Sequence, residues 1–477
     1  MVLKYRNGVA PGVLAVAIML AGSPAMAADG SDAATLDALQ AQVQTLSTQV
    51  RDLKRNQYAA TGGSDKRHDP DVRISLKNGR PTFSTADGNF SFALRSLVQF
   101  DTAYYSQDHA PAGSDLSSGS NFRRARLGFD GTAFKDWSYE FIYDFGGSGT
   151  ESGQIYSAYI QYNGLGPLHL RLGASPVPES FDDTTSASDL LFLERAQPAD
   201  VSRSLAGGPG RDNLTAFLYG DNYFGAVAYT GGKAGDSAVF DEQQAVVGRV
   251  VYAPIRTKDA TLALGFNGTY VFKLPDVAAG VNSPNGIRFR ERPELNVDGT
   301  RLIDTGNIAA DSLMQWGVEA AGNWRNFYGQ GGYFGLEANN DTPGLPGASF
   351  NGWYAQASWI LTGEERNYSS SRGAFAAPKV TDPWSPDHPG FGAWEIAARY
   401  SDLDLNDNAG TFGSTTPIGG IRGGEQKIWT AGLNWYPSNA IRFMLDYQHA
   451  DVDRLNAAGA TIGQKIDAVS LRTQLSL

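Results

Sequence analysis

Arginine recurs at alternate positions of short apolar segments in this chain, where lysine is nearly absent. Arg95, Arg124, Arg126 and Arg171 occupy such positions. A guanidinium group presents a planar fork of donors and stays charged at any working pH, so it suits oxyanions that pass singly. We therefore predict that these side chains share one surface and contact anions. The set continues with Arg249, Arg399, Arg442 and Arg472.

Acidic residues stand on the same face of these segments, so a second interpretation stays open. Each arginine could pair with an acid across the wall and make the structure rigid. For a single arginine the sequence does not decide between the two roles, but for the whole set it favours a net attraction of anions. The acids are Asp130, Glu140, Asp144, Glu395 and Asp446.

The sequence offers little support for catalysis. Gly235-Asp236-Ser237 and Asp387-His388 faintly resemble parts of an outer-membrane serine hydrolase, but we expect them at opposite ends of the fold. The five histidines are scattered, and no pair has the spacing of metal ligands. We predict no catalytic residue, no metal and no cofactor.

The elements that must position the arginines are strands, because the apolar residues recur at every second position. Trp137, Tyr139, Phe141 and Tyr143 alternate with residues that include Ser138, Glu140 and Asp144. One face of this strand is therefore apolar and the other mostly polar. This pattern continues along most of the chain, while no apolar run after the first residues could form a spanning helix. We predict an all-β transmembrane barrel with lipid outside and water inside.

We predict sixteen antiparallel strands, an even number that suits an aqueous channel. Short turns and long loops alternate between them, as in outer-membrane barrels, with one long exception on the turn side at 363–391. The expected strands are 90–106, 121–131, 136–145, 153–162, 167–174, 212–219, 222–230, 245–253, 260–272, 312–324, 327–338, 351–362, 392–402, 426–436, 440–450 and 465–477.

The N-terminal part has a different organisation. Residues 1–27 read as a signal peptide, with an apolar run and a small-x-small cleavage site at Ala25-Met26-Ala27. Residues 28–60 carry a heptad seam from Leu36 to Leu53 and predict a short coiled-coil helix that forms with partners. Residues 61–89 then read as a linker and periplasmic segment, and the barrel occupies 90–477.

Several segments together resemble the phosphate-selective porin O and P family. They cover roughly residues 72–477, and the family implies a trimeric sixteen-stranded porin whose third outside loop folds into the pore. That loop corresponds to residues 175–211. The segments are Phe122-Arg123-Arg124-Ala125-Arg126-Leu127, Gly131-Thr132-Ala133-Phe134-Lys135-Asp136-Trp137, Leu361-Thr362-Gly363-Glu364, Gly392-Ala393-Trp394-Glu395 with Arg399-Tyr400, and Gly432-Leu433-Asn434-Trp435-Tyr436.

The third loop departs from the family pattern because it contains acids and no lysine. The resemblance implies Arg195 as an anion contact, and Arg203 is a further basic residue of this loop. The Phe-Arg-Arg motif adds Arg123, which strict alternation would place on the other face from Arg124, at the rim. Asp182 and Asp183 oppose anion binding if they line the pore.

We therefore predict a passive channel in a Gram-negative outer membrane for small anions, with phosphate or polyphosphate as candidates. Two alternatives stay open, namely an outer-membrane hydrolase and a general porin that tethers the cell wall. Expected partners are anionic solutes, outer-membrane lipid, two further copies in a homotrimer, and the cell wall through the coiled coil. The net charge of −11 gives no support to nucleic-acid binding, and the lack of cysteine excludes disulfides.

Overall fold

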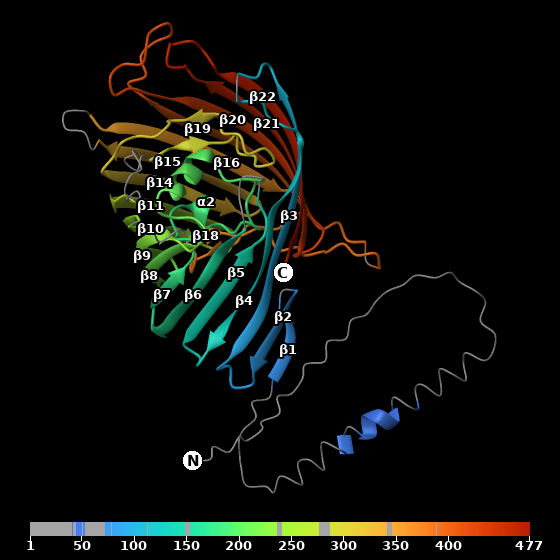
Figure 1. Cartoon of the computed structure of the whole chain (residues 1–477). Coiled ribbons are helices and arrows are strands. Elements are labelled where there is room, and N and C mark those ends of the chain that lie inside the picture. The colour runs from blue at the N-terminus through green and yellow to red at the C-terminus, as the bar shows by residue number, and fades with distance from the viewer. Residues whose placement is uncertain are drawn as a thin grey trace, which may run out of the picture. The chain divides into compact units, whose positions relative to one another are not determined.

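A computed structural model shows a closed antiparallel barrel (Figure 1). It describes residues 41, 44–49, 51–52, 72–77, 79–111, 113–147, 153–235, 241–275, 287–340, 346–387 and 389–477. The main sheet of the described part has 18 strands. Sixteen of them make the closed barrel, and β1 and β2 form a hairpin outside the closed ring. The barrel strands are β3 (Ser91–Gln107), β4 (Gly119–Ala133), β5 (Trp137–Asp144), β6 (Gln154–Leu165), β7 (Leu168–Ala174), β8 (Arg211–Tyr219), β9 (Tyr223–Lys233), β10 (Gln244–Arg256), β11 (Ala260–Lys273), β14 (Ser312–Trp324), β15 (Phe327–Asn339), β16 (Ala348–Ile360), β19 (Ala393–Asp407), β20 (Ile421–Tyr436), β21 (Ile441–Asp453) and β22 (Gln464–Ser476).

The barrel closes where its last strand pairs with its first. β22 runs antiparallel to β3, with Ser476 opposite Leu97 and Ile466 opposite Gln107. All the remaining pairs join strands that are neighbours in the chain. The closed ring therefore leaves no strand edge with unpaired backbone groups in the bilayer. All sixteen predicted strands are confirmed, although β19 and β20 extend further toward their shared loop than the alternation indicated.

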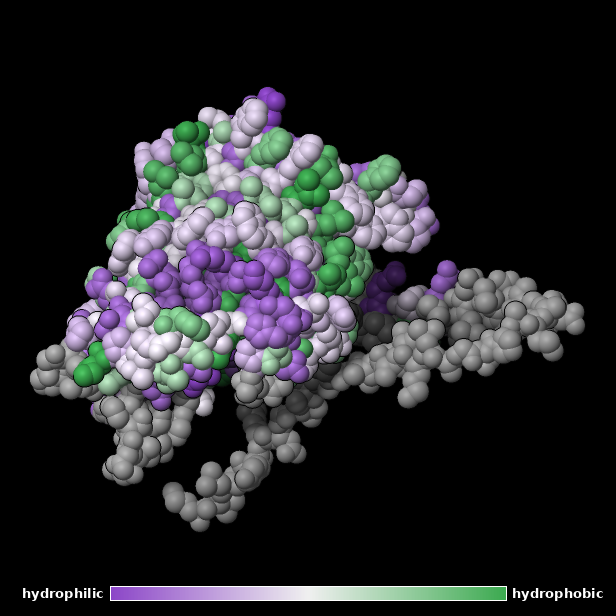
Figure 2. All heavy atoms as spheres, turned by 90° about the horizontal axis from the view of Figure 1, so that it is seen from above, coloured by the Kyte–Doolittle hydropathy of each residue, from purple (hydrophilic) through white to green (hydrophobic). Residues whose placement is uncertain are grey.

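The alternation places aromatic and aliphatic side chains on the outside of the barrel. In β5, Trp137 and Phe141 are exposed, whereas in β3 the polar Gln99 and Asp101 are fully buried on the inner face. Stacked rings near the turns, such as Trp394 against Trp435 with centroids 5.5 Å apart, form part of an aromatic girdle. Figure 2 shows hydrophobic side chains along one flank and a hydrophilic patch in the middle of the same view.

The connections alternate in length as predicted. Short turns such as 134–136 and 325–326 lie at one end, and long loops such as 175–210 and 274–311 lie at the other. The exception predicted on the turn side is also present, as residues 361–392, with the short strands β17 (Tyr368–Ser369) and β18 (Ala374–Phe375). We name these three long segments loop 3 (175–210), loop 5 (274–311) and the turn loop (361–392).

Before the barrel, the structure describes a hairpin that the sequence analysis read as linker. It consists of β1 (Val72–Lys77) and β2 (Arg80–Thr85), and β2 pairs with the first residues of β3. Residues 44–49 and 51–52 are helical, in agreement with the predicted helix. The signal peptide and most of the heptad seam lie outside the described residues. In the described part, no helix is long and apolar enough to cross a membrane.

The buried core of the protein lies inside the barrel rather than between sheets. Loop 5 contributes the buried side chains Phe289, Leu295 and Ile303, which pack against inward residues of the wall. Loop 3 contributes Phe181, and the turn loop contributes Phe375, to a second apolar cluster with wall residues. The lumen is therefore partly filled, and what remains open depends on how these loops are held.

Candidate functional site

Loop 3 enters the lumen after β7 and carries two short helices, α2 (Phe181–Thr184) and α3 (Gln197–Ser204). Ser180 caps α2, because its hydroxyl accepts a hydrogen bond from the Asp183 amide at 3.0 Å. Proline in the first turn of α3 suits a helix start. Much of the rest has no regular partners, so its carbonyl groups need donors from elsewhere.

Wall arginines supply those donors. Arg442 donates to the Leu190 carbonyl at 2.6 Å, and Arg472 donates to the Leu193 carbonyl at 2.5 Å. Arg399 donates to the Glu194 carbonyl at 3.0 Å. All three guanidinium groups come from strands and are buried. They were predicted on the lumen face, and the structure places them there, but it uses them to bind the backbone of loop 3.

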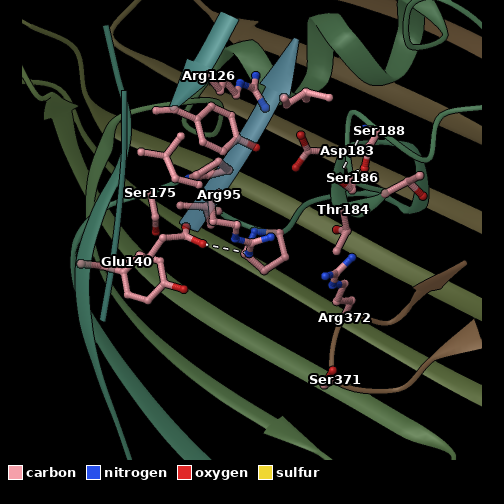
Figure 3. Close-up of a pocket in the computed structure, with 18 of the residues that line it drawn as sticks. Arg95, Arg126, Glu140, Ser175, Asp183, Thr184, Ser186, Ser188, Ser371 and Arg372 are labelled. Carbon is pink, nitrogen blue, oxygen red and sulfur yellow. Dashed lines mark hydrogen bonds and ion pairs between the residues drawn. The ribbon is translucent and has the colours of Figure 1, made fainter. Parts of the chain in front are cut away.

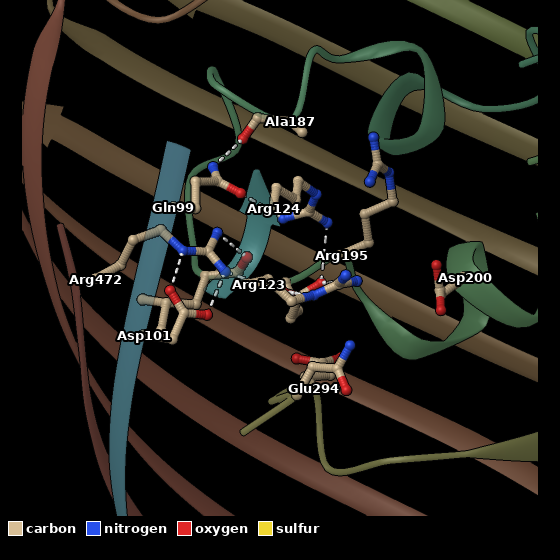
Figure 4. Close-up of polar contacts among 12 residues, drawn as sticks. Gln99, Asp101, Arg123, Arg124, Ala187, Arg195, Asp200, Glu294 and Arg472 are labelled. Atoms are coloured by element: carbon tan, nitrogen blue, oxygen red, sulfur yellow. Dashed lines mark hydrogen bonds and ion pairs between the residues drawn. The ribbon is translucent and has the colours of Figure 1, made fainter. Parts of the chain in front are cut away.

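A single carboxylate forms the densest part of this attachment. Glu194 accepts hydrogen bonds from Arg123 at 2.7 Å, Arg472 at 3.0 Å and Arg124 at 3.3 Å. Figure 4 shows the side chains of these three arginines close together. Arg472 also pairs with Asp101 at 2.6 Å. Burial favours the neutral acid, but the three guanidinium groups outweigh it and hold the pKa of Glu194 well below its ordinary value. We call these residues the Glu194 junction.

The inward position of Arg123 corrects the expectation from strict alternation. Gln99 pairs with Arg124 and Phe100 pairs with Phe122, so Arg123 is an extra residue in a β-bulge. A bulge turns the chain locally and re-aims a side chain. Arg123 and Arg124 therefore both reach Glu194, while Phe122 stays exposed on the outer wall.

The predicted basic residues of loop 3 are also bound within the protein. Arg195 is buried and donates to the carbonyls of Asp182, Asp183 and Thr185 at 3.0–3.1 Å. It thereby satisfies the last carbonyl groups of α2. Arg203 pairs with Asp183 at 2.5 Å and with Asp200 at 3.3 Å.

The two acids that could oppose anions both have partners within loop 3. The Asp182 carboxylate accepts from the Ala196 amide at 2.8 Å, and the Asp183 carboxylate is the one paired with Arg203. Both residues are buried. Arg249, predicted to line the pore, is also buried and donates to Thr184 at 3.0 Å and to the Gly373 carbonyl at 2.8 Å.

Loop 5 and the turn loop support loop 3 from its two sides. Glu294 of loop 5 accepts from the Gln197 amide at 2.8 Å and pairs with Arg399. Arg366 of the turn loop donates to the Asp189 carbonyl at 2.9 Å and pairs with buried Glu395 at 2.7 Å. Loop 3 is thus fixed between two other loops as well as along the wall.

One cavity lies between loop 3 and the wall formed by β3 to β8. This cavity encloses about 270 Å³. Four arginine and two acidic side chains border it, so the charged lining has an excess of two positive groups. In Figure 3, Arg95 and Arg126 lie on one side and Thr184, Ser186 and Ser188 of loop 3 on the other. The charged residues are Arg95, Arg126, Arg171, Arg372, Glu140 and Asp183.

The four arginines differ in how far neighbouring acids neutralise them. Arg95 contacts Asp130 at 3.0 Å and Glu140 at 3.1 Å, and Arg126 contacts Asp144 at 2.7 Å.

Arg171 has no such partner, since no carboxylate of the described residues lies within 4.0 Å of it. Its guanidinium group lies over the rings of Tyr159 and Phe217, at 4.0 and 4.6 Å from their centroids. Arg171 therefore offers the least neutralised positive charge of the three predicted arginines in this cavity.

This lining can bind and orient small anions. Guanidinium groups on one wall and hydroxyl groups on the other both donate hydrogen bonds to oxyanions. Among the described residues, no three histidine, aspartate or glutamate side chains are grouped to hold a metal ion.

Two features of the cavity escaped the sequence analysis. Tyr156 faces inward because a register shift in β6 lies between Ile155 and Ser157, and its ring lies 3.6 Å from Arg126. Arg372 belongs to the turn loop, about which strand alternation says nothing. The only feature of the sequence that pointed to this loop is the unusual length of the connection at residues 363–391.

Comparison with known proteins agrees with this geometry. Residues 92–477 match the family described as phosphate-selective porin O and P, so the chain belongs to that family. Porin O of Pseudomonas aeruginosa is 26% identical over 411 residues, which cover 81% of this chain and 88% of that protein. An uncharacterized protein of Caulobacter vibrioides is 27% identical over 405 residues, covering 80% and 75%.

Among solved structures, an anion-selective porin from Comamonas acidovorans has the same fold, with a TM-score of 0.50. It is 13% identical, and the match covers 81% of this chain and 100% of that one. Family membership and the closed barrel with its apolar outer wall identify the protein as an anion channel in the outer membrane of a Gram-negative bacterium.

The Glu194 junction predicts a specific defect on neutralisation. Glu194→Gln keeps the shape but removes the charge that three guanidinium groups share, and charge-assisted bonds contribute about 1.5–3 kcal/mol each. We expect amides of residues 186–196 to exchange with solvent at least roughly tenfold faster in hydrogen-exchange mass spectrometry. Asp189→Asn is the matched control, because Arg372 lies 4.0 Å from that carboxylate. Equal exchange in both variants would contradict the role of the junction.

A second prediction concerns pH. Burial, aided by the negative charge of Asp183, raises the pKa of Glu179 to about 8. Because this value lies above that of the unfolded chain, the stabilisation is complete in acid and is lost as the pH rises through about 8. We expect open-channel current noise to increase above that pH, as the base of loop 3 loosens. Glu179→Gln should show no such increase, and steady noise in the native channel would refute the prediction.

Proposed function

We propose that this channel favours small oxyanions, with inorganic phosphate as the representative solute. Solutes cross passively, pass between loop 3 and the wall of β3 to β8, and contact Arg95, Arg126 and Arg171 on the way. The single observation that carries this proposal is Arg171, a guanidinium group at the cavity with no carboxylate of the described residues in reach. An oxyanion would supply the missing charge.

The surroundings of the cavity support the same preference. Two guanidinium groups and several hydroxyls can face one oxyanion in a narrow passage, where charges are poorly screened. Asp182, which could have opposed anions, is bound inside loop 3, and Asp183, which borders the cavity, is paired with Arg203. The porin of Comamonas acidovorans is described as anion-selective, which is consistent with this assignment.

A general porin with weak selectivity is the alternative within the same fold. It is favoured by Asp130, Glu140 and Asp144, which offset Arg95 and Arg126. The two proposals differ in what a salt gradient would show. A selective pore has a reversal potential set by the anion, whereas a weakly selective pore has one near zero.

We also propose that the protein has no enzymatic activity. The relatives named above are porins, or of unknown activity, and membership in this family favours a channel. Ser237 and His388, on which the hydrolase alternative depended, lie outside the described residues. Neither a cofactor nor a metal is part of the proposed function.

For the assembly we propose a homotrimer, joined in part by the N-terminal heptad seam. Leu46 belongs to that seam and is 56% exposed in the single chain, as a side chain that meets a partner helix would be. The family resemblance favours three copies. A contact of the helix with the cell wall is a further possible role.

Selectivity can be measured directly on reconstituted channels. We expect phosphate to inhibit the chloride current, and Arg171→Gln to weaken that inhibition by roughly 10- to 100-fold, because a charged hydrogen bond contributes about 1.5–3 kcal/mol. Arg325→Gln is the control, since this exposed arginine lies in a turn and does not border the cavity. Cation preference in the native channel, or unchanged currents after Arg95→Gln with Arg171→Gln, would overturn the proposal.

The trimer makes a separate prediction. Leu46→Asp places a charge in the apolar seam, and we expect the assembly to dissociate at a lower temperature in mild detergent. Thr48→Asp is the control, since helical spacing puts Thr48 away from the seam. Size-exclusion chromatography with light scattering gives the mass of each form. A native protein that is monomeric under all mild conditions would exclude the assembly.

A further inference from the structure

The hairpin β1–β2 extends the barrel wall beyond its last strand. β2 pairs with β3 through Thr82 opposite Ala93, while β22 pairs with the same edge of β3 from Leu97 onward. The hairpin therefore occupies the position that a longer β22 would take. Figure 1 shows both strands beside the first residues of β3.

One face of this hairpin is apolar and exposed. Val72, Ile74 and Leu76 alternate along β1 and are 61%, 72% and 75% exposed. Ile74 lies opposite Phe83 of β2, which is also exposed, so the four side chains share one face. The other face of β1 carries Arg73 and Ser75. A small periplasmic hairpin has no reason to present such a row to water.

The apolar face is continuous with the lipid-facing wall of the barrel. The ring of Phe83 lies 6.2 Å from that of Phe92 in β3, which lies 5.4 Å from Phe129 in β4. Phe129 in turn lies 5.7 Å from exposed Phe141 in β5. These rings belong to the outer face that the bilayer covers.

The opposite face is fastened to the inside of the barrel. Arg80 of β2 donates to the Leu94 carbonyl at 3.1 Å and pairs with Asp130, the acid that also contacts Arg95. This attachment orients the hairpin, so that its polar face turns to the lumen and its apolar face turns outward.

We propose that the outward face of hairpin β1–β2 rests in the periplasmic leaflet of the outer membrane, with phospholipid acyl chains as its partner. The hairpin then acts as an interfacial anchor of the kind formed by amphipathic segments at membrane surfaces.

The absence of cysteine from the chain makes the test direct. Single variants Ile74→Cys, Leu76→Cys and Ser75→Cys, in the full-length protein, carry an environment-sensitive fluorophore. Leu471→Cys on the outer wall is the reference for lipid contact. Each protein is placed in nanodiscs of phosphatidylethanolamine and phosphatidylglycerol, with or without doxyl-labelled phosphatidylcholine, and a far-UV circular dichroism spectrum equal to that of the native protein confirms folding.

We expect the lipid quencher to reduce emission at positions 74 and 76 as at 471, and at least about twofold more than at 75, because alternate residues face opposite sides. Iodide in water should quench position 75 preferentially. Equal iodide quenching at 74, 75 and 76 would overturn the proposal. Protection of 74 and 76 from both quenchers would also overturn it, because another protein surface, such as a second copy at the open edge of β1, would then cover the face.

Discussion

The attachment of Glu194 to three guanidinium groups is the interaction on which the form of this channel depends. A loop of 36 residues inside a water-filled barrel has no sheet to join, so its path must be fixed by side chains. Arg123 and Arg124 come from one strand and Arg472 from another, and the carboxylate joins both to the loop. The junction fixes the loop at β4 and β22, and the cavity lies between that loop and the wall of β3 to β8.

The arginines of the lumen divide into two sets with different physical roles. Those behind loop 3, such as Arg442 and Arg399, donate hydrogen bonds to carbonyl groups that would otherwise be buried without a partner. Those on the free wall, above all Arg171, border the cavity and are the ones that we propose contact a passing solute. The position of each arginine relative to loop 3 therefore separates a structural role from the proposed role in attracting anions.

The filling of the lumen from both ends reinforces this division. Loop 5 covers apolar inner wall on the loop side, and the turn loop brings Arg366 beneath loop 3 and Arg372 to the cavity. Burial between these layers is accompanied by opposite pKa shifts in two acids of loop 3. The pKa of Glu194 falls because guanidinium groups surround it, whereas the pKa of Glu179 rises because it is buried beside Asp183. The attachment at Glu194 therefore persists in acid, whereas the packing around Glu179 weakens in alkali.

The sequence by itself determined the barrel, because the side-chain period of a strand is two and lipid requires an apolar outer face along every strand. It also identified loop 3 and placed Arg95, Arg126 and Arg171 on the inner wall. It could not place Arg123 or Tyr156, since a bulge shifts the alternation by one residue and leaves no mark in composition. It could not distinguish Arg171 from Arg249 either. Both face inward. Only the path of loop 3 and the turn loop, set by contacts between residues far apart in the chain, decides that Arg249 is covered whereas Arg171 borders the cavity.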